Sequence, residues 1–209
     1  MSHQPDLAQS DVSQPDVSQP DLARPDLAWI DPAAPPRDGV YRLVVAMAER
    51  QAAVGWLTVP PRAEVVAWLD DVLAGGARMV AVHDPAGQLV ASGYWVRQSA
   101  AVLTHSAEIR KVMVHPEAQG RGLGQAVVSA LVADAAAAGV ELLLLDVRGN
   151  NHAALRLYAR LGFVVSGRRP DLIAVGEQRF DQVLMHRDLR SGPGKLRRNG
   201  GRRSGPGHT

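Results

Sequence analysis

The stretch HPEAQGRGLGQAVV, residues 115–128, decides how this sequence can be interpreted. It places Gly120, Gly122 and Gly124 within five positions and then continues into good helix formers. Glycine inside regular structure costs roughly 0.5–1 kcal/mol, so such a cluster usually marks unusual backbone dihedrals or a close approach to the backbone. The unpaired N–H groups and the partial positive charge at a helix N-terminus also favour a bound phosphate. The stretch therefore predicts a phosphate-binding loop.

The segments on either side of this loop predict a strand–helix–strand–helix order. AEIRKVMV (107–114) has the pattern of a strand, and the residues after the loop predict a helix to about residue 138. VELLLLDVR (140–148) predicts a buried strand. NHAALRLYARLGF (151–163) predicts a short helix, with Gly162 at the position of a C-terminal cap.

The remaining segments complete a mixed sheet. VYRLVVAMA (40–48) predicts a first strand, and AEVVAWLDDVLAGG (63–76) predicts an amphipathic helix that ends at a glycine pair. Two apolar runs around DPAG predict a hairpin over 78–97, and a last hairpin covers 164–189. This element order predicts an α/β fold, in which a central mixed β-sheet carries helices on its faces.

Composition divides the chain into one domain and two tails. From Gln4 to Ala28 a pentapeptide is repeated five times, as QPDLA, QSDVS, QPDVS, QPDLA and RPDLA, with a period that fits neither helix nor strand. Such sequence cannot bury enough surface to offset the entropy of ordering. The C-terminal residues are rich in glycine and arginine. We therefore predict disordered tails at 1–36 and 191–209 around a domain at 37–190.

The net charge of +2 hides opposite charges in the two tails. Residues 1–36 hold six aspartates and one arginine, a net charge of −5, whereas residues 191–209 carry +5 and leave the middle at +2. The pI near 9.4 therefore gives little support to nucleic-acid binding. The absence of cysteine excludes disulfides and thiolate metal sites. With neither a signal-peptide pattern nor a bilayer-spanning apolar run, we expect a cytoplasmic protein without membrane or nucleic-acid partners.

Three kinds of glycine loop bind phosphates, and two of them do not fit. A P-loop needs lysine and then serine or threonine after its last glycine, but Gln125 and Ala126 follow Gly124. A dinucleotide fingerprint needs G-x-G-x-x-G, and no frame of the loop supplies the third glycine. The pattern Q-x-x-G-x-G is satisfied by Gln119, Gly122 and Gly124, directly after a predicted strand.

With this pattern the sequence resembles the GNAT superfamily of N-acetyltransferases. VMVHPEAQGRGLGQAVV is similar to the pyrophosphate-binding segment of that family, and LDVRGNNHAALRLYARLGF is similar to a later strand and helix of the same family. The two matches cover about residues 105–165. The resemblance implies the GNAT fold, acetyl-CoA as co-substrate and acetyl transfer to an amine.

The resemblance also implies which residues hold acetyl-CoA. Val112 and Val114 would pair their backbone with the pantetheine arm, and a backbone N–H near Met113 would polarise the thioester carbonyl. The backbone of the loop would bind the pyrophosphate, as backbone N–H groups at helix N-termini do. This cradle comprises Gln119, Gly120, Arg121, Gly122, Leu123, Gly124 and Gln125. The Arg121 side chain either contacts the phosphates or stays solvated.

Three side chains are candidates for the remaining roles. Asn151 is expected to cap the last helix, and the resemblance adds a contact to acetyl-CoA. Tyr158 would protonate the departing thiolate, although packing alone also explains it. Glu108 would be the base, because strand alternation places it on the side of Val112 and Val114; the alternative is a surface carboxylate paired with Arg110 or Lys111.

The other candidates for a site are weaker. His105 and His115 are weaker candidate bases than Glu108, and His115 stands in an HP pair that more often shapes a turn. No His/Asp/Glu spacing predicts a metal site, so no metal is expected.

The sequence thus predicts an N-acetyltransferase that transfers acetyl from acetyl-CoA by direct attack of an amine. The alternative is a non-catalytic acyl-CoA sensor, which would keep the glycine loop without needing Tyr158. A small-molecule or peptide amine is the expected partner, and a homodimer is left open.

Overall fold

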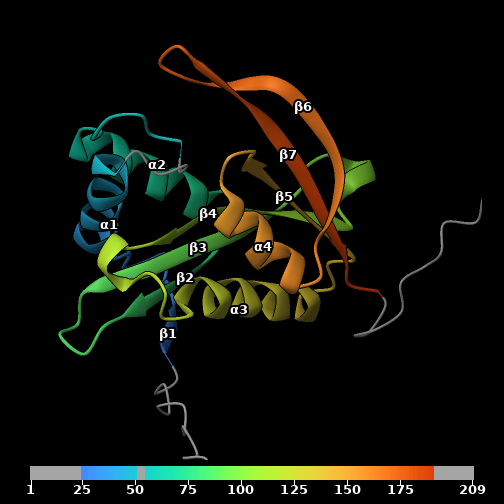
Figure 1. The fold of residues 1–209 in the computed structure, drawn as a ribbon. Coiled ribbons are helices and arrows are strands. Elements are labelled where there is room, and N and C mark those ends of the chain that lie inside the picture. The colour runs from blue at the N-terminus through green and yellow to red at the C-terminus, as the bar shows by residue number, and fades with distance from the viewer. Residues whose placement is uncertain (1–24, 51–54, 191–209) are drawn as a thin grey trace, which may run out of the picture.

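A computed structural model describes residues 25–50 and 55–190 as one mixed sheet with helices on both faces (Figure 1). The first four pentapeptides and the basic C-terminal tail lie outside these residues. The sheet has seven strands in the order β1-β2-β3-β4-β5-β7-β6. Its strands are β1 (Asp26–Trp29), β2 (Arg78–His83), β3 (Leu89–Arg97), β4 (Ser106–Val114), β5 (Leu142–Arg148), β6 (Val164–Val175) and β7 (Gln178–Asp188).

Four α-helices in the described residues cover this sheet from two sides (Figure 1). They are α1 (Arg37–Glu49), α2 (Arg62–Ala74), α3 (Leu123–Ala137) and α4 (His152–Arg160). Side chains of α1 and α2 share a buried cluster with Met79, Tyr94 and Met113 of the strands. Side chains of α3 and α4 form a second cluster that includes Ile109 and Leu143. The described part of the chain therefore has two cores, one on each face of the sheet.

Strands β4 and β5 are parallel neighbours that pair over a short stretch only. Their register joins Ser106–Glu108 to Leu142–Leu144, whereas β5 pairs with β7 along its whole length. Within the described residues, no register pair joins β4 to β5 beyond Glu108. The half of β4 that leads to the glycine loop thus keeps an edge that β5 does not cover.

Most of the predicted elements are confirmed. The structure contains the helix at 63–76, the hairpin over 78–97, the strands at 107–114 and 140–148, and the helices that follow each of these two strands. Gly162 ends the last helix with φ +82°, as a glycine cap requires. In the described residues no helix is long and apolar enough to cross a membrane.

The prediction of a strand at 40–48 is wrong, because these residues lie in α1. Their β-branched side chains favour a strand. However, the buried positions Val40, Leu43, Val44 and Met47 are spaced by three and four residues, which is the period of a helix. The packing of this apolar stripe against the sheet therefore outweighs the strand propensity of the individual side chains.

The prediction of disorder over residues 1–36 is wrong for residues 26–29, because these residues form a strand of the sheet. The last pentapeptide forms β1, which pairs antiparallel with β2 from Asp26↔His83 to Trp29↔Val80. The Arg78 guanidinium lies 4.9 Å from the centre of the Trp29 ring. Repeat composition indicates disorder, but an edge strand gains ladder hydrogen bonds that composition does not reveal.

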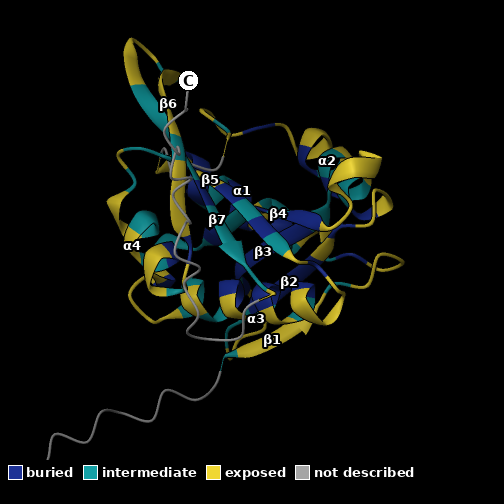
Figure 2. Cartoon of the chain, turned by 90° about the vertical axis from the view of Figure 1, so that its right-hand side faces the viewer, coloured by how far each residue is buried: buried dark blue, intermediate teal, exposed yellow. Residues whose placement is uncertain are grey.

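Burial is concentrated on the central strands (Figure 2). Strands β2 and β3 are mostly buried, whereas β6 is exposed along most of its length. The β6–β7 hairpin extends beyond the helices as an arm (Figure 1).

Candidate active site

The glycine loop joins the end of β4 to the start of α3, as predicted. A 3₁₀ turn at Pro116–Ala118 comes first, and then Gly120 and Gly122 adopt φ +78° and +75°. These left-handed dihedrals disfavour any side chain. A Cβ at either glycine would meet no described atom within 4 Å, so the space beside them is open. Glycine is required at these two positions because of the left-handed backbone. It is not required by a lack of space for a side chain.

Gly124 has a different role from the other two glycines. A Cβ there would lie 3.3 Å from Leu157 Cδ2 and 3.6 Å from Val114 Cγ2. This glycine therefore lets α3 pack closely against α4 and the end of β4. The third glycine orients the helix, and the first two shape the loop.

Helix α3 begins directly after the second left-handed glycine of the loop. Gly122 occupies the N-cap position, and within the described residues no side chain caps this helix. The backbone groups of the first turn thus keep the capacity to bind an anion. Gln119, Gly120, Arg121, Gly122 and Gln125 are exposed, while Leu123 and Gly124 are partly buried.

The turn before the loop is held by its own hydrogen bonds. His115 Nδ1 accepts from the Glu117 backbone N–H at 3.3 Å, and Arg121 donates to the Glu117 carbonyl at 3.2 Å. His115 therefore shapes the turn, as its position before proline predicts. A hollow of ≈ 260 Å³ adjoins this turn and is lined by Arg42, Val90 and Ala118, among others.

Tyr158 lies on α4 and is 8% exposed. Its ring contacts Phe163 edge to face, with the ring centres 5.8 Å apart. Burial raises the pKa of the Tyr158 phenol above its usual range, and the Asp146 carboxylate adds to the shift. The phenol is therefore protonated at neutral pH. Asp146 is an exposed residue of β5 that sequence reasoning missed. Its effect on the pKa of Tyr158 makes it a further candidate residue of the site.

Asn151 caps α4, as predicted. Its Oδ1 accepts a hydrogen bond from the Ala154 backbone N–H at 3.2 Å. This bond satisfies one of the free donors at the start of the helix.

Glu108 does not lie on the side of Val112 and Val114, so this prediction is wrong. Met113 pairs with Ser92 and Arg110 with Tyr94, so β4 has one residue more than β3 over this stretch. The extra residue is a β-bulge, and Lys111 within it adopts φ +50°. A bulge reverses the alternation of faces beyond it.

The two halves of β4 therefore face differently. Val112 and Val114 pack against the cluster of α3 and α4, and Met113 is buried against α1 and α2. Glu108 lies opposite Val96, a residue packed on the α1–α2 cluster. The structure thus brings the candidate acid Tyr158 and the candidate base Glu108 to the sheet from opposite faces.

Glu108 is held by polar neighbours. Its Oε2 accepts from Arg110 Nη2 at 2.6 Å and from Gln98 Nε2 at 3.4 Å. The ion pair with Arg110 is the one that the sequence offered as the alternative to a catalytic role. A carboxylate held this way shares its lone pairs with the guanidinium.

Aromatic side chains gather beside the bulge, and sequence reasoning missed them. The Trp56 and Trp68 rings meet edge to face at 5.3 Å, and Trp68 lies 6.1 Å from Tyr94. Lys111 Nζ lies 3.7 Å from the centre of the Trp56 ring and 5.7 Å from that of Trp68. Burial lowers the pKa of Lys111 to about 8. The one feature of the sequence that could have drawn attention to Lys111 is the scarcity of lysine. No local sequence pattern connects Lys111 with Trp56, Trp68 and Tyr94.

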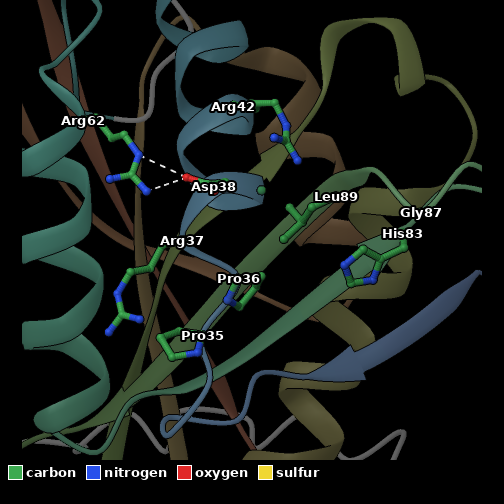
Figure 3. Close-up of a pocket in the computed structure, with 10 residues that line it drawn as sticks. Pro35, Pro36, Arg37, Asp38, Arg42, Arg62, His83, Gly87 and Leu89 are labelled. Atoms are coloured by element: carbon green, nitrogen blue, oxygen red, sulfur yellow. Dashed lines mark hydrogen bonds and ion pairs between the residues drawn. The ribbon is translucent and has the colours of Figure 1, made fainter.

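A larger hollow of ≈ 470 Å³ lies elsewhere, between the start of α1 and the β2–β3 hairpin (Figure 3). Arg62 points toward Asp38 and donates to its carboxylate, while Arg42, His83 and Leu89 line other sides. None of the predicted site residues lines this hollow. In the described parts of the chain no group of three His, Cys, Asp or Glu residues is placed to hold a metal ion.

Comparison with known proteins agrees with this geometry. The model of the Acetyltransferase (GNAT) family matches residues 26–163, which include the sheet from β1 to β5 and all four helices. The phosphinothricin acetyltransferase (Pat) of Sinorhizobium meliloti, solved in complex with acetyl-CoA, superposes with a TM-score of 0.69 at 20% identity. This superposition covers 85% of this chain and 95% of that chain. It shows the fold.

Sequence relatives match a shorter part of the chain. The L-amino acid N-acyltransferase MnaT of Escherichia coli K12 is 37% identical over 68 residues, which are 32% of this chain and 39% of that protein. The [ribosomal protein bS18]-alanine N-acetyltransferase of the same organism is 33% identical over 84 residues, or 40% of this chain and 57% of that protein. Both alignments span less than two thirds of the relative's length. With the family model matched over most of the folded domain, this chain belongs to the GNAT family of acetyltransferases.

Proposed function

We propose that this chain is an acetyl-CoA-dependent N-acetyltransferase that transfers acetyl directly to an amine. The observation that carries the proposal is the glycine loop between β4 and α3, with two left-handed glycines, open space beside them and an uncapped helix N-terminus in the described structure. Membership of the GNAT family supports the same activity.

The loop would hold the pyrophosphate of acetyl-CoA. The backbone N–H groups between Gly120 and Gln125 supply donors without side chains in the way, and the dipole of α3 favours the negative charge. Arg121 is tied to the Glu117 carbonyl, so its guanidinium stays close to the loop and adds positive charge there. Gln119 precedes the first glycine and completes the cradle.

The uncovered edge of β4 would hold the rest of the co-substrate. Val112 and Val114 offer main-chain groups on the stretch of β4 that no register pair joins to β5 in the described residues. A backbone N–H near Met113 would stabilise the oxyanion that develops on the thioester carbonyl. Asn151 already caps α4 and would add a contact to acetyl-CoA from the start of that helix.

Tyr158 would supply the proton that the departing thiolate needs. Its raised pKa keeps the phenol protonated throughout the physiological range, so the proton is present when the thiolate leaves. The same property excludes Tyr158 as a base at neutral pH. The buried contact with Phe163 holds the Tyr158 ring in place before the reaction, so no further entropy is lost in ordering this side chain.

Glu108 remains the proposed base, acting directly or through water. Its position on the α1–α2 face separates it from Tyr158, so the acceptor amine would approach from one face and the leaving thiolate would be protonated from the other. The Arg110 ion pair partly occupies the oxygens of Glu108. Asp146, which interacts with Tyr158, is the second carboxylate to be tested.

The acceptor is an amine, which we propose to be the α-amino group of an amino acid or of a protein N-terminus. Two relatives support these classes, one named for L-amino acids and one for the alanine of ribosomal protein bS18. A panel of free amino acids, amino-acid amides and alanine-led peptides tests the proposal, with release of free thiol from acetyl-CoA as the readout. Turnover with at least one α-amine supports the function. Binding of acetyl-CoA without turnover on any amine would favour a sensor instead.

A further inference from the structure

Lysine is nearly absent from this chain. Of 23 basic residues, 21 are arginine and two are lysine, namely Lys111 and Lys195. Lys195 lies in the C-terminal tail, outside the described residues. The part of the chain that the structure describes therefore has arginine at every basic position except Lys111. Arginine stays charged, whereas a lysine can lose its proton and act as a nucleophile.

Lys111 is half-buried in an aromatic environment. Its ammonium lies 3.7 Å from the centre of the Trp56 ring, and Trp68 forms the second wall. A Cβ on Gly55 would be 2.8 Å from Lys111 Nζ, so the backbone at Gly55 lies close to the amine. The side chain therefore has one well-defined place, on the face of the sheet that α1 and α2 cover.

The bulge places Lys111 at one end of the segment proposed to bind acetyl-CoA. Lys111 directly precedes Val112, and the glycine loop lies beyond Val114 at the other end. An arm that starts at the loop and pairs with Val114 and then Val112 has its thioester end toward Lys111. The left-handed φ of +50° is a strained conformation for lysine, and such residues concentrate at functional sites.

We propose that Lys111 is a site of self-acetylation, at which the chain transfers acetyl from its own bound acetyl-CoA to the Lys111 side chain. The proposal rests on the function proposed above. Neutral Nζ attacks the thioester carbonyl carbon, so an N–C bond forms and the C–S bond breaks. The nitrogen loses a proton to water and the thiolate takes one up, which leaves acetyl-lysine and free coenzyme A. The depressed pKa of about 8 supplies the neutral amine near physiological pH.

The modification would change the acceptor face. Acetyl-lysine is a neutral amide, so the interaction of the Lys111 cation with Trp56 is lost. The added acetyl group also needs space that Gly55 and Trp56 now fill. Self-acetylation would therefore displace Gly55 and Trp56.

Peptide mass spectrometry of the full chain incubated with acetyl-CoA alone, without acceptor, tests the proposal. We expect acetylation of Lys111 to exceed that of Lys195 roughly tenfold or more, because reaction within the acetyl-CoA complex favours Lys111. Its rate constant should not change with protein concentration. Lys195 serves as the built-in reference for chemical acetylation by the reagent. Lys111→Arg, which keeps the charge, should show no acetylation at position 111.

Two outcomes would overturn the proposal. One is an unmodified Lys111 in a chain that binds acetyl-CoA and acetylates an amine, which leaves the proposed function standing. The other is acetylation of Lys111 that persists undiminished in Gly122→Val, a variant designed to lose acetyl-CoA, since this shows reaction from solution. Failure of the wild-type chain to bind acetyl-CoA in a thermal-shift assay would instead contradict the proposed function itself.

Discussion

At the scale of single residues, Tyr158 is the side chain whose surroundings match its proposed role most closely. Because burial raises its pKa, the Tyr158 phenol still carries its proton at neutral pH, so a proton is at hand when the thiolate of coenzyme A leaves. Tyr158→Phe keeps the ring and its contact with Phe163 and removes only the hydroxyl. The variant thus separates catalysis from packing.

We expect Tyr158→Phe to lower kcat by roughly 10²–10⁴, the usual effect of losing a general acid. The dissociation constant of acetyl-CoA, measured by calorimetry, should hardly change, because the proposed contacts to acetyl-CoA come from other residues. Tyr41→Phe on α1 is the matched control and should keep the wild-type rate. Full activity in Tyr158→Phe would remove this residue from the mechanism.

The base is tested by comparing two carboxylates. If Glu108 removes the proton of the acceptor, the rate of Glu108→Gln keeps climbing with pH toward the ionisation of the acceptor amine, whereas the wild-type rate levels off earlier. Asp146→Asn should then keep the wild-type profile. The measurement is kcat/KM against pH for all three proteins. If only Asp146→Asn changes the profile, Asp146 is the base and Glu108 serves its ion pair with Arg110.

How far the sequence predicts the site depends on whether the geometry is local. The loop was predictable, because the left-handed dihedrals of Gly120 and Gly122 are a property of the glycines themselves. The face of Glu108 was not, since the bulge at Lys111 arises from the register between β3 and β4. The aromatic surroundings of Lys111 could not be predicted either, because Trp56 and Trp68 come from segments more than 40 residues earlier in the chain.

At the scale of elements, Asp134 joins α3 to two strands. Its carboxylate accepts from Arg78 Nη2 of β2 at 2.8 Å and from Trp95 Nε1 of β3 at 2.8 Å. Hydrogen bonding to Arg78 lowers the pKa of Asp134. Because the folded pKa lies below the unfolded one, this contribution to stability is present above the unfolded pKa and is lost as the pH falls through the folded pKa.

We therefore expect Asp134→Asn to lower the free energy of unfolding by roughly 1–3 kcal/mol at neutral pH, as for hydrogen bonds to charged groups. The difference from the wild type should shrink once acid protonates Asp134. Urea unfolding at several pH values measures both effects. Asp71→Asn on α2, an exposed position, is the control and should leave stability nearly unchanged. A loss in Asp134→Asn that does not depend on pH would contradict the ionic account.

The prediction from sequence was wrong at α1, and the reason is again that contacts distant in the sequence decide the structure. Residues 40–48 carry strand-forming side chains, and only the burial of Leu43, Val44 and Met47 on one stripe shows that tertiary packing overrides that preference. The later elements were easier, because glycines follow α3 and α4 and an apolar run marks β5.

At the scale of the whole molecule, the folded domain is longer than composition predicts, because β1 belongs to the sheet. A chain of residues 25–190 should therefore keep the turnover of the full chain on a small amine. A chain of residues 37–190 loses β1 and the contact between Trp29 and Arg78, so its melting temperature should be lower. Thermal unfolding and thiol release measure the two effects. Loss of turnover in 25–190 with intact stability would show that a tail takes part in the reaction.

The central claim is that the glycine loop holds the phosphates of acetyl-CoA, and the most direct measurement is the thermal shift that acetyl-CoA produces in three proteins. A ligand at 100 times its Kd stabilises the folded state by about 2.7 kcal/mol, so the wild type should show a clear shift. Gly122→Val places a side chain beside the loop, and Gly139→Val places the same side chain at the opposite end of α3.

Both glycines have left-handed φ, +75° and +74°, and at neither would a Cβ meet a described atom within 4 Å. The backbone strain, at least about 1–2 kcal/mol, is therefore matched. We predict that both variants melt at lower temperature without ligand, and that only Gly122→Val loses the shift with acetyl-CoA. A folded Gly122→Val protein with the full shift would contradict the account.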